Sequence, residues 1–60
     1  MKIGKLYKVR KSAVSIRLLS VDEKKDVYTY ELYVRRRFVR VDSMPGDKFR
    51  SIAAKAYEDE

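Results

Sequence analysis

The chain has 60 residues, of which 45% are hydrophobic and 40% charged, with a formal net charge of +6 and no His or Cys. A chain of this length buries only about 60% of the surface that its unfolded state exposes, so one small core is expected. The absence of His and Cys excludes disulfides, thiol or imidazole catalysis and a conventional zinc site. A site made of carboxylates alone stays open, but the paired acids at residues 22–23 and 58–60 fall in a predicted loop and at the chain end, where nothing would desolvate them. We expect a single non-enzymatic domain over residues 1–60, with no cofactor and no metal.

The N-terminal residues show no targeting or membrane segment. Residues 1–8 mix charged and apolar side chains, and they contain no apolar run of signal-peptide length. No part of the chain approaches the roughly 18 apolar residues that a spanning helix needs. These features predict a cytoplasmic protein without a membrane partner, or a virion-associated protein if its origin is viral.

Residues 3–9 form the first predicted strand. Apolar side chains occur on both of its faces, with Ile3 and Tyr7 on one and Leu6 on the other. A mixed pattern of this kind is typical of an edge strand, where exposed lysines also disfavour pairing with another sheet. We therefore predict an edge strand here.

Residues 13–21 and 27–34 predict a β-hairpin. In each segment apolar and polar side chains alternate, which is the pattern of a strand with one buried face. The intervening residues 22–26 are short and polar, as in a hairpin loop. The predicted core face comprises Val14, Ile16, Leu18, Tyr28, Tyr30, Leu32 and Val34.

A change in the apolar alternation marks the next boundary. The apolar positions are even-numbered up to Val34 but odd-numbered at Val39 and Val41. Such a change requires a bulge or a tight turn near residues 35–37. Because these three residues include no Gly, Asn, Asp or Pro, we predict a bulge or bend and a following strand over residues 37–41.

A C-terminal helix is predicted over residues 47–58. Pro45-Gly46 ends the preceding strand, and Asp47 is a favourable N-cap residue. Helical spacing aligns one apolar stripe, made of Phe49, Ile52, Ala53, Ala56 and Tyr57. The stripe should lay Phe49, Ile52 and Tyr57 over the sheet, while the acidic residues 58–60 should fray the helix end. The predicted fold class is α+β: a small three- to four-stranded antiparallel sheet with one C-terminal helix packed on one face.

The charge distribution indicates a polyanion-binding region. Residues 1–41 hold 12 of the 15 Lys and Arg residues and four of the nine acids, a net charge of +8, whereas residues 42–60 carry −2. The Arg guanidinium donates paired hydrogen bonds to phosphate oxygens, and neighbouring aromatic rings can stack on exposed bases. The candidate nucleic-acid-binding residues are Lys5, Lys8, Arg10, Lys11, Arg17, Tyr33, Arg35, Arg36, Arg37, Phe38 and Arg40.

Two alternatives to nucleic acid account for the same residues. A basic surface is also compatible with a solvated face, or with a structural or inhibitory protein that docks on an acidic protein partner. The sequence does not choose between DNA and RNA. A homodimer through an exposed edge strand is a further expectation, because so small a core benefits from additional burial.

Residues 39–57 also carry a family resemblance. Gly46-Asp47, Ile52-Ala53 and Tyr57 follow the spacing found at the opening of a LysM module, which this segment resembles, although Lys48 stands where that family usually has Thr. LysM modules bind N-acetylglucosamine glycans, and LysM-like pieces occur in phage tail and baseplate proteins. The resemblance thus implies a virion or assembly component. The start of a helix followed by an apolar stripe that faces the core explains the same residues without a relationship to LysM modules.

Overall fold

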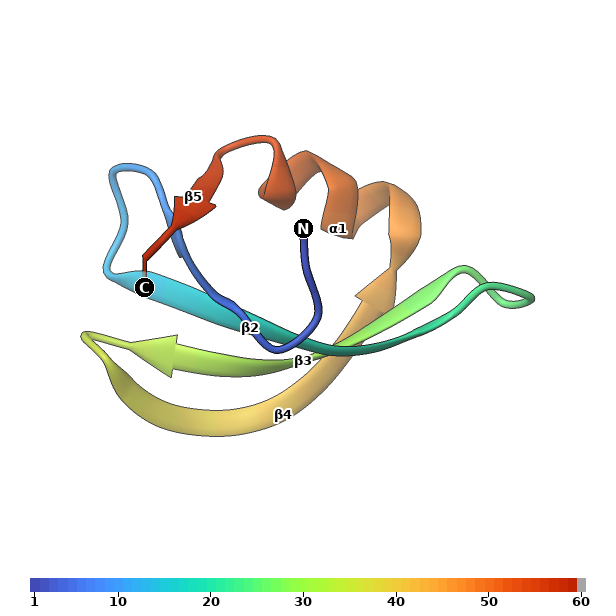
Figure 1. Cartoon of the computed structure of the whole chain (residues 1–60), viewed down its shortest axis with the longest axis horizontal. Helices are drawn as coiled ribbons and strands as arrows, with labels where there is room; N and C mark the ends of the chain where they lie inside the picture. Colours follow the sequence, from blue (N-terminus) through green and yellow to red (C-terminus); the bar gives the residue numbers. More distant parts are fainter. Residues whose placement is uncertain (60) are drawn as a thin grey trace.

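The computed structural model describes residues 1–59, which form one five-stranded antiparallel sheet and one short helix (Figure 1). The elements in chain order are β1 (Leu6–Val9), β2 (Val14–Asp22), β3 (Val27–Val34), β4 (Arg37–Pro45), α1 (Gly46–Ala53) and β5 (Ala56–Glu58). The sheet order is β4-β3-β2-β1-β5, so a four-stranded meander is extended by β5 on the far side of β1. The predicted α+β class is confirmed, with one strand more than expected.

The core lies between the curled sheet and α1 (Figure 1). Phe49 of α1 is only 1% exposed, and its ring stacks on Tyr28 at a centroid distance of 4.5 Å. Its centroid is 6.0 Å from that of Tyr30. The buried cluster consists of Tyr7, Ile16, Leu18, Tyr30 and Phe49. Of the predicted core-face residues only Val34, at the end of β3, lies outside this core with 39% of its surface exposed.

The first strand is shorter than predicted and is not at an edge. β1 begins at Leu6, and both Leu6 and Tyr7 are buried although they lie on opposite faces. β5 pairs with the free side of β1, placing Tyr57 opposite Lys8 and Ala56 opposite Val9, so β1 is an inner strand. The mixed apolar pattern therefore reflects a strand that buries a side chain on each face.

The predicted helix is wrong in its C-terminal half. α1 ends at Ala53, and Ala56–Glu58 pair with β1 instead of continuing the helix. Unpaired backbone groups of β1 need hydrogen-bond partners, and pairing with β5 satisfies them. Tyr57 is consequently 45% exposed in β5 and does not cover the sheet. The predicted fraying is also wrong for Asp59, whose N–H donates to the Leu6 carbonyl at 2.9 Å; Glu60 lies outside the described residues.

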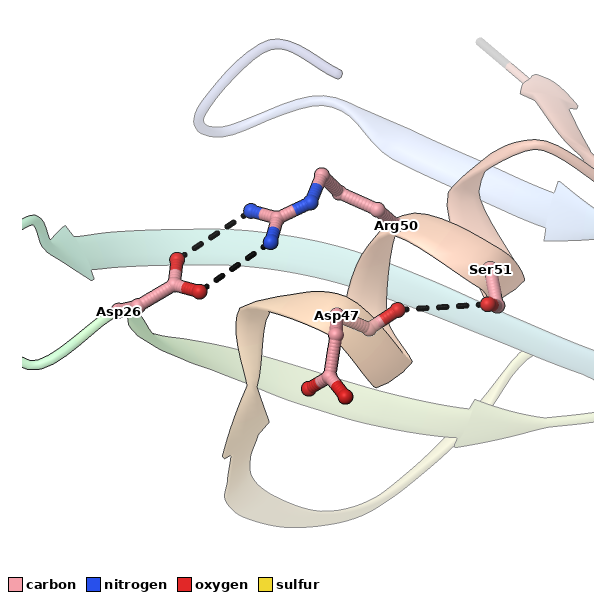
Figure 2. A network of polar contacts seen from close by, with 4 residues as sticks. All are labelled: Asp26, Asp47, Arg50 and Ser51. Carbon is pink, nitrogen blue, oxygen red and sulfur yellow. Dashed lines mark hydrogen bonds and ion pairs between the residues drawn. The ribbon is translucent and has the colours of Figure 1, made fainter.

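The start of α1 also differs from the prediction. Pro45 is the N-cap residue, no side chain caps the helix, and Asp47 instead lies in the first turn, where its charge favours the positive end of the helix dipole. Figure 2 shows how this end is attached to the β2–β3 loop: the Arg50 guanidinium donates two hydrogen bonds of 3.2 Å to Asp26. The Gly46 N–H donates to the Asp26 carbonyl at 2.7 Å, and a Cβ at position 46 would collide with the Asp26 carboxylate. No helix within residues 1–59 is long and apolar enough to cross a membrane.

The connection between β3 and β4 corrects the predicted bulge or bend. Arg35 and Arg36 form a two-residue turn between the paired Val34 and Arg37, with φ values of 51° and 66°. Positive φ at both central positions defines a type I′ hairpin turn. A register shift follows in β4, where Val39 is inserted between Phe38 and Arg40. The change of apolar phase thus comes from a tight turn and a bulge together.

β4 is an exposed edge strand of nine residues. It carries three features that disfavour pairing with a second sheet: the bulge at Val39, the charges of Arg37 and Arg40, and Pro45 at its end. Homodimerisation through an edge strand stays a prediction, and these features oppose it at β4.

Candidate nucleic-acid interface

Three chain connections meet at one end of the sheet. The Arg35 N–H in the β3–β4 turn donates to the carbonyl of Ala13, next to β2, at 2.9 Å. The Arg10 N–H in the β1–β2 loop donates to the Lys55 carbonyl, between α1 and β5, at 2.8 Å. Figure 1 shows the β1–β2 loop and the β3–β4 turn together at the left of the molecule. We call this region the basic end and define it by Lys8, Arg10, Lys11, Arg35, Arg36, Arg37 and Lys55.

The charges of the basic end are largely unneutralised. Asp59 is the one carboxylate within residues 1–59 that forms an ion pair with any of these seven cations, and its Oδ2 lies 3.1 Å from Arg36 Nη2. A concentration of like charge opposes folding but attracts polyanions. The basic end is therefore the strongest candidate for an electrostatic binding surface.

Backbone strain is also concentrated at the basic end. Lys11, Arg35 and Arg36 all have positive φ, between 51° and 66°, in a conformation that costs an L-residue with a bulky side chain on the order of 1–2 kcal/mol. Asp26, at the opposite end of the sheet, is the remaining non-glycine residue with positive φ in the described chain, and Asp tolerates this conformation well. Three cationic residues with strained backbone conformations at one end of the sheet indicate a constraint other than stability.

The outer face of the sheet, turned away from α1, holds the two candidate aromatic residues. The Tyr33 hydroxyl donates to Glu31 Oε1 at 3.0 Å, and the Arg17 guanidinium lies 5.8 Å from the centre of the Tyr33 ring. Arg17 also lies 3.9 Å from Glu31. Phe38 meets Tyr33 edge-on at 5.8 Å but is 55% exposed. The Arg17 charge is thus offset within this face, whereas Phe38 presents an accessible ring beside the basic end.

Lys5 and Arg40 lie outside the basic end. Lys5 Nζ is 3.5 Å from Glu58 Oε1. Arg40 lies opposite Leu32, a residue of the core face, and donates a 3.2 Å hydrogen bond to Asp42. The pKa of Asp42 is lowered by the hydrogen bond from the Ser43 N–H and, to a smaller extent, by Arg40. Neither cation adds to the charge cluster that the other candidates form.

The basic end contains a hollow of about 280 Å³ on the outer face. Its lining consists of Lys8, Ala13, Ser15, Arg35, Arg36 and Asp59. Ser15 is the most buried of them, at 2% exposed, and lies opposite both Lys8 and Tyr33 in the sheet. Lys55, Ser15 and Asp59 were not among the residues predicted from sequence. Their positions depend on β5 and on strand register, for which no local sequence signal was evident.

No family model, curated protein or solved structure matches this chain. The fold and the site therefore define only a class: a small α+β domain with a cationic end. The likeness of residues 39–57 to a LysM module stays a sequence-based prediction. In the structure these residues comprise most of β4, all of α1 and the first part of β5.

Proposed function

We propose that this protein is a small non-catalytic nucleic-acid-binding protein that contacts phosphates through the basic end of its sheet. The observation that carries the proposal is the placement of Lys11, Arg35 and Arg36 in strained turn conformations at one site. Strain of this kind persists where the surrounding structure fixes it and is concentrated at functional positions. Asn or Gly in the turn would relieve the strain but would remove the charges.

Free cations and an exposed ring favour a single-stranded segment as the ligand. Six cations of the basic end form no ion pair with any described residue: Lys8, Arg10, Lys11, Arg35, Arg37 and Lys55. Phe38 directly follows Arg37 and is accessible. Arg and Lys contact the backbone of any sequence, and an aromatic face accepts any unstacked base. Binding should therefore show little sequence preference, for DNA or RNA.

The proposal predicts a steep salt dependence of binding. If the basic end contacts about four or five phosphates of a single strand, log K against log salt should have a slope of about −3. Fluorescence anisotropy with labelled single-stranded DNA, single-stranded RNA and duplex DNA at several salt concentrations measures it. A flat slope, or no binding at low salt, would contradict the proposal.

Phe38→Ala should weaken single-strand binding about ten-fold, because base–aromatic stacking contributes on the order of 1–3 kcal/mol per base. The loss should be smaller for duplex DNA, whose bases are already stacked. Val41→Ala is the matched control, since Val41 lies on the same strand and face and is similarly exposed. Equal affinities of the two variants for the single strand would exclude a stacking role.

An acidic protein partner is the second candidate. The outer face presents the exposed apolar side chains of Phe38 and Val41, and aromatic residues are enriched at protein–protein interfaces. A protein partner would bind the basic end by charge complementarity and also cover this face. Capture of an acidic protein, together with no nucleic-acid binding at low salt, would favour this candidate.

A further inference from the structure

The hollow at the basic end has the chemistry of an anion subsite. Three cationic side chains line it, from β1 and from the β3–β4 turn: Lys8, Arg35 and Arg36. Ligand pockets usually begin at about 300 Å³, so a hollow of about 280 Å³ suits a small group such as one phosphate with its attached sugar. Arg offers a planar fork of donors that matches phosphate oxygens.

One of these guanidinium groups, that of Arg36, is already paired with a carboxylate, that of Asp59. Asp59 Oδ1 accepts a hydrogen bond from Arg36 Nη2 at 3.3 Å, and Oδ2 lies 3.1 Å from the same nitrogen. The Asp59 side chain is 13% exposed, and its backbone is fixed by the hydrogen bond to Leu6. Arg36, by contrast, is 71% exposed and moves at little cost. Asp59 thus holds Arg36 at the hollow, but its negative charge would repel an incoming phosphate.

We propose that the hollow binds a single phosphate group, and that Asp59 competes with this phosphate for Arg36. The proposal rests on the nucleic-acid function above, which would supply the phosphate either from the backbone or from a phosphorylated chain end. Lys8 and Arg35, which have no ion pair within residues 1–59, would contact the phosphate directly. Arg36 would exchange its carboxylate partner for a phosphate oxygen.

Asp59→Asn tests the competition, with Glu58→Gln as its matched control. Both substitutions remove one negative charge from neighbouring residues of the C-terminal segment, so they change the net charge equally. Glu58 lies opposite Tyr7 and pairs with Lys5, away from the hollow. Asp59→Asn should tighten oligonucleotide binding about three- to five-fold relative to Glu58→Gln, as expected when the exposed guanidinium of Arg36 is released from its carboxylate partner. Equal affinities of the two folded variants would overturn the proposal.

The source of the phosphate follows from comparing oligonucleotides with a 5′-phosphate or a 5′-hydroxyl. A gain from Asp59→Asn that is confined to the phosphorylated oligonucleotide assigns the hollow to a chain end, and an equal gain assigns it to a backbone phosphate. Inorganic phosphate at constant ionic strength should also shift the backbone amide NMR signals of Ser15 and Arg36 but not those of the β2–β3 loop. Absence of these shifts would contradict the subsite even if salt-dependent nucleic-acid binding is found. Their presence without nucleic-acid binding would retain the subsite and reject the proposed function.

Discussion

Replacing Arg35 and Arg36 with Asn and Gly should stabilise the fold and weaken nucleic-acid binding. Asn-Gly is the preferred sequence of a type I′ turn, and both positions have positive φ. Relief of the strain at two positions should outweigh loss of the Arg36–Asp59 ion pair, in which Arg36 is exposed and Asp59 largely buried, giving a gain of about 1–2 kcal/mol in the free energy of unfolding. For a domain of this size, at about 4–8 °C per kcal/mol, that gain raises Tm by roughly 4–16 °C.

The same double variant should lose at least about ten-fold in affinity, and the salt slope should become shallower by about 1 to 2. Thermal unfolding followed by circular dichroism and anisotropy titrations measure the two effects. Arg35→Lys with Arg36→Lys is the control, because it keeps the charge and the strain and should leave stability within about 0.5 kcal/mol of the original. If Asn-Gly stabilises the protein and leaves affinity unchanged, the basic end is not the binding surface.

This turn also shows where sequence-based reasoning failed. Turn propensities argued against a tight turn at residues 35–37, because none of the usual turn residues is present. The pairing of β3 with β4 nevertheless requires the chain to reverse there, with Val34 opposite Arg37. Local preference and global fold conflict at this point, and natural proteins retain such conflicts mainly at functional sites.

The alternation in β2 and β3 was a reliable signal for a different reason. Each of these strands packs one face against the core, so a period of two is imposed along both, apart from the bulge beyond Leu18. β5 gave no comparable signal, because three residues are too few to show a period. The apolar spacing of Ala56 and Tyr57 also continued the pattern of α1. The end of the helix could therefore not be placed from sequence.

The candidate site was predicted in part. Charge alone identified six of the seven cations of the basic end, because they occur in the acid-free N-terminal segment and in the run at residues 35–37. That these cations lie at one end of the sheet depends on the order of the strands, as the hydrogen bond from Arg35 to Ala13 shows. Arg17 and Arg40 were included on charge, but carboxylates on their own or adjacent strands offset them. The hollow could not be predicted, since it requires both β5 and the register that buries Ser15.

Phe49→Ala should be the most destabilising single substitution in the core. The ring is 1% exposed and contacts the rings of Tyr28 and Tyr30 on the sheet. Its removal should cost about 3–5 kcal/mol in lost burial and cavity formation. A 60-residue domain has a total stability of only about 3–9 kcal/mol, so much of the variant should be unfolded at 37 °C. Urea unfolding at 10 °C measures the loss.

Phe38→Ala removes the same type of side chain from an exposed position. Comparing the two losses of stability therefore shows how much of the loss at Phe49 is due to burial. The Phe38 variant should lose no more than about 1 kcal/mol, since its ring is half exposed and mainly contacts Tyr33. A loss at Phe49 as small as this would mean that α1 does not pack on the sheet. Binding should follow the folded fraction of the Phe49 variant, because the sheet brings the β1–β2 loop and the β3–β4 turn together. Stability and binding should thus fall together in Phe49→Ala, whereas we expect them to change in opposite directions in the Asn-Gly variant. The reason is that the side chains that carry the proposed binding charges are also those that strain the turn.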